Sequence, residues 1–261
     1  ISTRDCLERL RRDSNEELKD DVWVPGHEIV GHVVRTGMNA EFLLDQRVAA
    51  LLPYGGGCSQ YVCISSKDVI ALPRDAGSND VVMLLSTFMT AYQCLESAVG
   101  IEAVQSINPG KRSRLFGKNV LIVGAGSPVG LALVELARNA GATVYTVSHS
   151  SNLSAIRAMG AHYWYGFSQK ETWEAKWAGE MDLIVDTIGD PDNNPSFHKV
   201  MKTGARLVRA NITSCEKKYV SHPETETYQF GSGILDDGGK KSNDKAIDYD
   251  VCHSFNEDKE L

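Results

Sequence analysis

The sequence lacks the features of several large classes of protein. None of its apolar runs is long enough to span a membrane, so no membrane partner is expected. It has no basic stripe and its formal net charge is -7 at pH 7, which argues against a nucleic-acid partner. Cysteines are scattered, which predicts free thiols in a reducing compartment, and hence a cytoplasmic protein. They are Cys6, Cys58, Cys63, Cys94, Cys215 and Cys252.

The two ends of the sequence are unlike those of a complete protein. It begins at Ile1 rather than at Met, no signal or transit segment is visible, and it ends in a charged stretch. We therefore expect a fragment, from which any targeting segment has been lost. The 261 residues leave room for one large domain or two ordinary ones.

The clearest pattern runs from Asn119 to His149. Residues 120–123 have the length and β-branched content of a strand buried on both faces, and residues 143–147 repeat this pattern. Between them, apolar residues from Leu131 to Ala137 recur at helical spacing before Gly141. Strand, glycine-rich turn, helix and strand form a βαβ unit, which predicts a parallel sheet with a right-handed crossover.

The turn of this unit predicts a cofactor site. Its backbone N–H groups and the start of the helix would face open space, an arrangement suited to a pyrophosphate. Three residues separate its second and third glycines, so the G-x-G-x-x-G fingerprint is irregular, and glycines at such turns also occur for packing alone. The flanking strand–helix–strand pattern favours dinucleotide binding. The predicted cofactor-binding residues are Gly124, Ala125, Gly126, Ser127, Pro128, Val129 and Gly130.

The rest of the chain divides into a β-rich part and an alternating part. Residues 1–21 resemble the end of a strand followed by a polar loop or helix. Strands with turns between them are expected within residues 22–36, with a kink or close backbone approach at Gly31, and at 45–52, 59–64 and 69–73. This pattern predicts a small barrel-like or sandwich domain.

A buried helix is expected over residues 80–95, with Ser78 or Asn79 as its N-cap, followed by a polar linker at 101–117. Beyond the βαβ unit, a helix at 153–159 and strands at 181–186 and 206–209 extend a doubly wound sheet. From Ser214 onward the pattern decays, and residues 236–245 are predicted to form a mobile surface loop.

Several motifs resemble those of the medium-chain dehydrogenase/reductase superfamily, in the same order along residues 1–213. The stretch Pro25-Gly26-His27-Glu28-x-x-Gly31-x-Val33 is similar to the family's PGxExxGxV signature. Asp45-Gln46-Arg47-Val48 resembles its GDRV, Thr90-Ala91-Tyr92-Gln93 matches its TAYQ, and Met181-Asp182-x-x-x-Asp186 with Lys202-x-Gly204 fits its later strands. The nearest resemblance is to its zinc-independent, quinone-oxidoreductase-like branch.

The resemblance implies an α/β fold: a Rossmann doubly wound parallel sheet plus a partial GroES-like β-barrel catalytic domain, with a cleft between them. The expected limits are 1–78 for the catalytic domain, 79–213 for the nucleotide-binding domain and 214–261 for a loop-rich tail or insertion. The family's catalytic domain has strands before and after these residues, so the resemblance also implies truncation at both ends. It further suggests a homodimer.

A catalytic zinc requires three protein ligands and an open fourth position. His27 stands where the family's zinc histidine would be, but the other two ligand positions fall at Ser2 and Ser86. A neutral hydroxyl offers zinc neither charge nor softness, so we predict no metal. The counter-interpretation is that Cys6 supplies the first ligand.

The cofactor type is predicted from the end of the second strand. An NAD site has an acidic residue there for the ribose 2′-hydroxyl, whereas Ser148 to Asn152 contain no carboxylate. Ser148 and His149 can accept a 2′-phosphate that a carboxylate would repel, which favours NADPH. The nearest basic residue is Arg157.

Without zinc, hydride would pass from NADPH to a polarised small-molecule acceptor, a quinone or an α,β-unsaturated carbonyl. By resemblance, the catalytic residues are Thr90, near the nicotinamide, and Tyr92, whose hydroxyl would bind a carbonyl oxygen. Ordinary interdomain packing is the alternative for both. Alternative functions are an enoyl reductase, stand-alone or from a polyketide synthase, a zinc alcohol dehydrogenase, and a non-catalytic nucleotide-binding protein.

Overall fold

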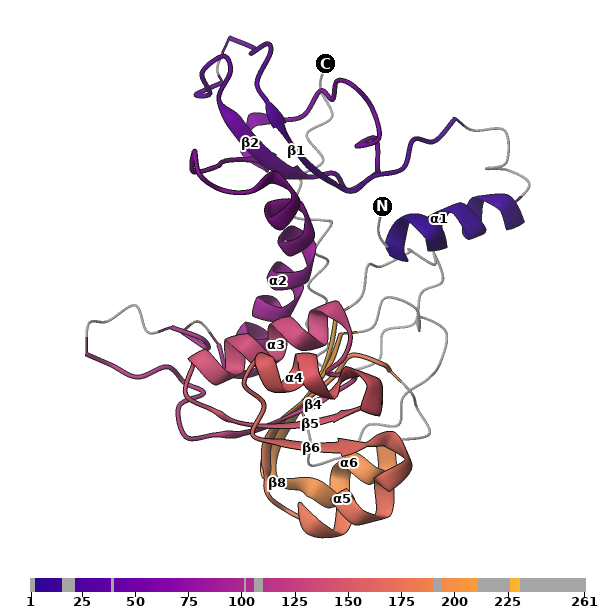
Figure 1. The fold of residues 1–261 in the computed structure, drawn as a ribbon, viewed down its shortest axis with the longest axis vertical. Helices are drawn as coiled ribbons and strands as arrows, with labels where there is room; N and C mark the ends of the chain where they lie inside the picture. Colours follow the sequence, from indigo (N-terminus) through magenta and orange to yellow (C-terminus); the bar gives the residue numbers. More distant parts are fainter. Residues whose placement is uncertain are drawn as a thin grey trace. The chain divides into compact units, whose positions relative to one another are not determined.

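The computed structural model describes residues 3–15, 22–38, 40–100, 102–105, 110–189, 194–210 and 226–230 (Figure 1). The chain divides into two compact units, Ile1–Thr87 and Phe88–Leu261. The sequence predicts the first domain boundary nine residues earlier, between residues 78 and 79. The expected domain limits stay a prediction.

The first unit contains helix α1 (Thr3–Ser14) and a three-stranded antiparallel sheet. The sheet order is β1 (Glu28–His32), β2 (Arg47–Leu51) and β3 (Val69–Ala71), and the 3₁₀ turn η1 (Ser66–Asp68) precedes β3. These strands confirm three of the four expected ones. The strand predicted at 59–64 is wrong, since these described residues form none.

Two further details of this unit differ from the sequence prediction. The chain is helical from Thr3, where the end of a strand was expected. Charge pairs one turn apart favour this helix, because Arg12 contacts Glu8 at 3.0 Å and Arg9 contacts Asp13 at 3.1 Å. The close backbone approach predicted at Gly31 is also wrong, because a Cβ added there would meet no atom within 4 Å.

Helix α2 (Ser78–Val99) continues from the first unit into the second. Its first hydrogen bond runs from Val81 N to the carbonyl of Gly77, so the N-cap is Gly77 and not Ser78 or Asn79. Its last turns bury Ala91, Cys94, Leu95 and Ala98. Met83 and Leu84 are exposed by 72% and 46%, so the predicted burial holds only for the second half of the helix.

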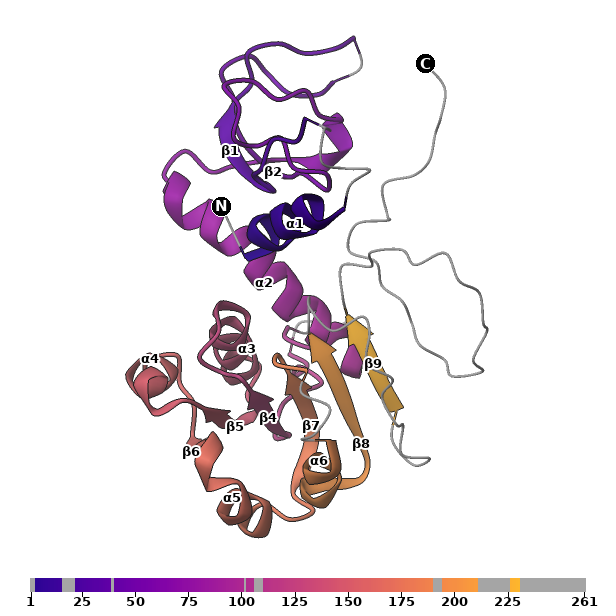
Figure 2. The same cartoon turned by 90° about the vertical axis from the view of Figure 1, so that its right-hand side faces the viewer.

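The second unit is built on a six-stranded parallel sheet (Figure 2). In sequence its strands are β4 (Asn119–Val123), β5 (Thr143–Ser148), β6 (Tyr163–Gly166), β7 (Met181–Asp186), β8 (Met201–Ala210) and β9 (Glu226–Phe230). In space the order is β6-β5-β4-β7-β8-β9, so the direction of chain winding reverses between β4 and β7. This reversal is the topological switch point of a doubly wound sheet.

Helices cover both faces of this sheet. Successive side chains of a strand point to opposite faces, so Val120 and Ile122 belong to one hydrophobic cluster, which includes α3 (Pro128–Asn139) and α4 (Leu153–Ala158). Leu121 and Val123 belong to the other, which includes α5 (Lys170–Lys176) and α6 (Asn194–Val200). Short 3₁₀ turns, η2 (Ser150–Asn152) and η3 (Phe167–Gln169), precede α4 and α5. The predicted doubly wound sheet is confirmed.

The sequence missed β6, α5, α6 and β9. The last of these falls within residues 214–261, where a loop-rich tail was expected, and pairs in parallel with β8. The loop predicted at 236–245 lies outside the described residues. Among the described helices, none has both the length and the apolar character needed to cross a membrane. The described cysteines, Cys6, Cys58, Cys63 and Cys94, are free thiols.

Candidate functional site

The glycine-rich turn joins the end of β4 to the start of α3. Gly124 has φ +80°, a left-handed conformation that glycine adopts without strain. Ser127 caps α3, because its Oγ accepts a hydrogen bond from Gly130 N at 3.0 Å, and Pro128 fills the first helical position. A serine cap followed by proline is the preferred start of a helix, so the sequence itself fixes where α3 begins.

This turn presents free donors at the start of a 12-residue helix. Within the described residues, no hydrogen bond uses the backbone N–H of Gly126 or Val129. The N-terminus of α3 carries the positive end of the helix dipole, and unpaired N–H groups there favour an anion. These groups fit the pyrophosphate of a dinucleotide.

The glycines of the turn are closely packed. A Cβ on Gly130 would collide with the carbonyl of Gly124, and a Cβ on Gly126 would collide with the side-chain amide of Asn152. A Cβ on Gly124 would collide with the hydroxyl of Thr187, which directly follows β7. The turn is therefore enclosed by its own helix and by the ends of both neighbouring strands.

The two cofactor-binding residues predicted at the end of β5, Ser148 and His149, differ in their exposure. Ser148 is only 1% exposed, and its hydroxyl lies 3.4 Å from the carbonyl of His149 and 3.5 Å from Asn152 Nδ2. His149 is exposed, with its ring edge-on to Phe167 at a centroid distance of 5.2 Å. The side chain available to a ligand is thus that of His149, while the buried hydroxyl of Ser148 accepts a hydrogen bond from Asn152. Arg157 is exposed in the last turn of α4.

The end of β7 contributes two polar side chains. Thr187 Oγ1 lies 2.9 Å from Val123 O and 3.3 Å from Ser127 Oγ. Asp186 is buried and its Oδ1 accepts from Ile188 N at 2.9 Å and Gly189 N at 3.1 Å, which fixes the bend after the strand. Neither Thr187 nor Asn152 was singled out from the sequence. The switch-point rule was the available signal, because it directs attention to the carboxyl end of the strand beside β4.

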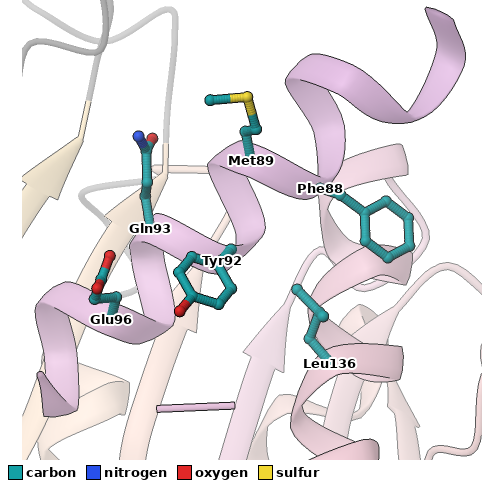
Figure 3. Close-up of a pocket in the computed structure, with 6 residues that line it drawn as sticks. All are labelled: Phe88, Met89, Tyr92, Gln93, Glu96 and Leu136. Atoms are coloured by element: carbon teal, nitrogen blue, oxygen red, sulfur yellow. The ribbon is translucent and has the colours of Figure 1, made fainter. Parts of the chain in front are cut away.

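A pocket of about 430 Å³ lies on α2 (Figure 3). Its lining residues are Phe88, Met89, Tyr92, Gln93, Glu96 and Leu136. Leu136 is the lining residue from α3 and lies eight residues after Pro128, about 12 Å along the helix. Tyr92, 40% exposed, therefore lies beside the second half of α3, and Thr90 does not line the pocket. The structure brings the seven turn residues together with Ser148, and it places Tyr92 in this separate pocket.

Comparisons with known proteins agree with this fold. Residues 128–223 match the zinc-binding dehydrogenase family. The JamJ enoyl reductase structure matches with a TM-score of 0.69 at 20% identity, over 88% of this chain and 69% of that one. The quinone oxidoreductase of Thermus thermophilus, also determined in complex with NADPH, matches with a TM-score of 0.55 at 24% identity, over 72% and 54%.

Sequence relatives also include a quinone oxidoreductase homolog. The chloroplast envelope quinone oxidoreductase homolog of Arabidopsis thaliana is 26% identical over 141 residues, 53% of this chain and 40% of that protein. The family match and these relatives together support a quinone-oxidoreductase-like member of the medium-chain dehydrogenase/reductase superfamily. The fold is that of these neighbours, a Rossmann sheet accompanied by part of a GroES-like domain. The polyketide synthase protein NorB of Streptomyces orinoci is 28% identical over 193 residues, 72% of this chain and 8% of its own length. The chain thus spans less than half of both relatives.

The superfamily raises the question of zinc, and the described residues do not fit a catalytic zinc site. His27 is buried, and its Nδ1 lies 2.7 Å from Asp5 Oδ1, which also accepts from Gly26 N at 2.7 Å. No three His, Cys, Asp or Glu side chains gather in the described ranges closely enough to hold a metal ion. Cys6 is exposed, and Ser2 lies outside the described residues. No chemical step is therefore derived through zinc.

Proposed function

We propose that this chain is part of an NADPH-dependent reductase that transfers hydride to a quinone or an α,β-unsaturated carbonyl without zinc. The observation that carries the proposal is the turn after β4. It lies at the switch point of the sheet, it begins a capped helix, and its N–H groups at Gly126 and Val129 are unused by the described residues. Ligands of open parallel sheets bind at this position.

The preference for NADPH rests on charge at the end of β5. Residues 148–152 contain no carboxylate, and His149 is exposed there. A carboxylate would attract the 2′-hydroxyl of NADH and repel the 2′-phosphate of NADPH. An exposed imidazole donates a hydrogen bond to a phosphate, and it does so more strongly when protonated. Arg157 is the nearest guanidinium for the same phosphate.

The residues of the chain would bind and orient the reactants. The turn from Gly124 to Gly130 would hold the pyrophosphate, and His149 would hold the adenosine end. Bound NADPH supplies the hydride. In the absence of a metal, the carbonyl oxygen of the acceptor needs a hydrogen-bond donor as negative charge develops on it. The resemblance, and not the position of the pocket that Tyr92 lines, assigns this role to the hydroxyl of Tyr92, with Thr90 near the nicotinamide, and the packing alternative predicts that neither hydroxyl affects turnover.

An enoyl reductase is the second candidate. The JamJ enoyl reductase matches more of this chain than the quinone oxidoreductase of Thermus thermophilus does, 88% against 72%. The acceptor would then be an enoyl thioester, which is itself an α,β-unsaturated carbonyl. Both candidates use the same cofactor site and differ in the acceptor. The homodimer and the cytoplasmic location suggested by the sequence stay predictions.

The cofactor proposal is tested by titrating the folded chain with NADPH and NADH while following cofactor fluorescence. Tighter binding of NADPH supports it. His149→Glu should weaken NADPH binding at least tenfold and change NADH binding much less, because the new carboxylate meets the 2′-phosphate. His149→Gln is the matched neutral control. Tighter binding of NADH refutes the 2′-phosphate argument, and binding of neither nucleotide favours a non-catalytic protein.

The acceptor is identified by measuring NADPH oxidation with 1,4-benzoquinone and with a crotonyl thioester, each with and without a chelator. Turnover of the quinone that resists the chelator supports the first candidate, and preference for the thioester supports the second. Loss of turnover on chelation, restored by added zinc, would refute the zinc-free proposal. Tyr92→Phe should lower kcat with little change in the Kd of NADPH.

A further inference from the structure

The strand on the far side of the switch point holds the cofactor turn in shape. β7 pairs with β4 in parallel, with Val123 opposite Asp186, so Thr187 follows directly beside the start of the turn. The backbone continues this pairing, since Thr187 N donates to Val123 O at 3.0 Å. The side chain of Thr187 therefore reaches the turn from the neighbouring strand and not from within the turn.

One hydroxyl at this position contacts an oxygen at the end of β4 and two oxygens of the turn. Thr187 Oγ1 lies 2.9 Å from Val123 O, 3.1 Å from Gly124 O and 3.3 Å from Ser127 Oγ. A hydroxyl has one proton to donate and lone pairs to accept with. The proton of Thr187 goes to the backbone carbonyls, so its lone pair accepts the proton of Ser127.

The hydroxyl of Ser127 is thereby fixed at both ends. Its oxygen accepts from Gly130 N at 3.0 Å as the cap of α3, and its proton is directed to Thr187. The result is a continuous chain of hydrogen bonds from the first turn of α3, through Ser127 and Thr187, to the carbonyls that end β4. Linked hydrogen bonds polarise and strengthen one another.

Packing at Gly124 reinforces this arrangement. A Cβ on this residue would collide with Thr187 Oγ1 and would lie 2.8 Å from Ile188 Cγ1. Gly124 also has φ +80°, so the turn takes its shape against Thr187 only because glycine stands there.

We propose that Thr187 is a positioning residue of the dinucleotide site. Through Ser127 it sets the direction of the N–H groups of Gly126 and Val129, which no described residue uses. A loop that is ordered in advance loses less conformational freedom on binding, which increases affinity. This inference rests on the proposed cofactor site, and it assigns to Thr187 no contact with the cofactor itself.

The test compares two single substitutions that differ in the hydroxyl. Thr187→Val keeps the shape and removes the hydroxyl, so the Kd values of NADPH and NADH should both rise about 3- to 10-fold, the effect of a lost hydrogen bond. Thr187→Ser keeps the hydroxyl and should stay within about twofold of the wild type. The ratio of the two Kd values should not change, because β4 separates β7 from β5 and Thr187 contacts the turn, not the residues proposed to bind the 2′-phosphate.

A double substitution tests the route through Ser127. In a Ser127→Ala background, Thr187→Val should add less than about twofold, since its partner is already gone. Wild-type affinity in Thr187→Val, or equal weakening by Val and Ser, would overturn the inference. If Thr187→Val unfolds at the assay temperature, Thr187→Cys provides a weak donor of similar size and should give an intermediate loss. A folded wild type that binds neither nucleotide refutes the proposed cofactor site instead, so the two failures are distinguishable.

Discussion

Gly126 and Asn152 form a matched pair whose coupling can be measured. A Cβ added to Gly126 would lie 2.5 Å from Asn152 Cγ and 2.7 Å from Asn152 Cβ, and it would overlap the amide nitrogen. Rotation of the Asn152 side chain moves the amide but leaves its Cβ in place. Gly126→Ala therefore forces a shift of the backbone at Asn152, and it should destabilise the protein.

The change in the free energy of unfolding caused by Gly126→Ala is the sum of two opposing effects. Overpacking of this kind costs about 1–3 kcal/mol. Gly126 does not have a left-handed φ, so alanine fits its backbone, and the loss of freedom in the unfolded chain stabilises by about 0.4–1 kcal/mol. In a protein with Asn152→Gly, Gly126→Ala should thus be neutral or slightly stabilising. The expected coupling energy is about 1–3 kcal/mol, with a smaller value for Asn152→Ala, which retains the Cβ.

The assay is thermal unfolding of the four proteins of the cycle, followed by circular dichroism and repeated in urea. Gly126→Ala should lower Tm by up to roughly 10 °C in the wild type and leave it unchanged or slightly higher in the Asn152→Gly background. Equal losses in the two backgrounds would show that Asn152 does not occupy the space above Gly126. That result would refute the packing argument.

Three further predictions concern stability. Burial, with a smaller contribution from Arg138, lowers the pKa of His162 below 6.5, and its Nδ1 accepts from Val144 N at 2.9 Å. The unfolded chain therefore takes up the proton first, and the free energy of unfolding should fall as the pH drops below about 6.5, a slope that His162→Gln should flatten in urea titrations. Burial alone would raise the pKa of Asp182, but hydrogen bonds from Asn119 N and Lys202 and the charges of Lys118 and Lys202 lower it below 3.8. Asp182→Asn should cost about 1 kcal/mol at pH 7 in urea unfolding, and the loss should vanish as the pH falls through the lowered pKa. Asp5→Asn should cost about 1–3 kcal/mol by the same measurement, because Asp5 is buried and accepts from Gly26 and His27, and an unchanged urea midpoint would contradict this.

The βαβ unit could be predicted because its evidence is local. An apolar strand, a glycine turn with a serine cap and a periodic helix follow one another without interruption, and each supports the next. α1 could have been predicted as well, since Glu8–Arg12 and Arg9–Asp13 are favourable pairs at helical spacing. The charge pairs, and not the few apolar residues, are the signal that indicates a helix there.

Other elements depend on partners that are distant in sequence. β6 is short, and its aromatic residues pack on the sheet: Tyr163 stacks on Tyr145 at a centroid distance of 4.7 Å, and Tyr165 lies 5.0 Å from Trp177. α5 and α6 have seven residues each, too few for helical periodicity to be clear. Residues 59–64 contain the aromatic and β-branched residues typical of a strand but pair with no other strand in the described part of the chain. Composition identifies a candidate strand, and only pairing with a neighbour makes it one.

The residues of the site likewise divide into those that local sequence predicts and those that it does not. Its backbone donors follow from the turn sequence, whereas Asn152 and Thr187 follow the two strands that flank β4, and no local pattern places them against Gly126 and Gly124. Each glycine of the irregular fingerprint is needed for a packing contact. Packing and cofactor binding are therefore not alternative explanations of this turn. The close contacts with the ends of β5 and β7 leave the backbone of the turn little freedom, and a turn held in this way presents its N–H groups in one direction, as a pyrophosphate site requires.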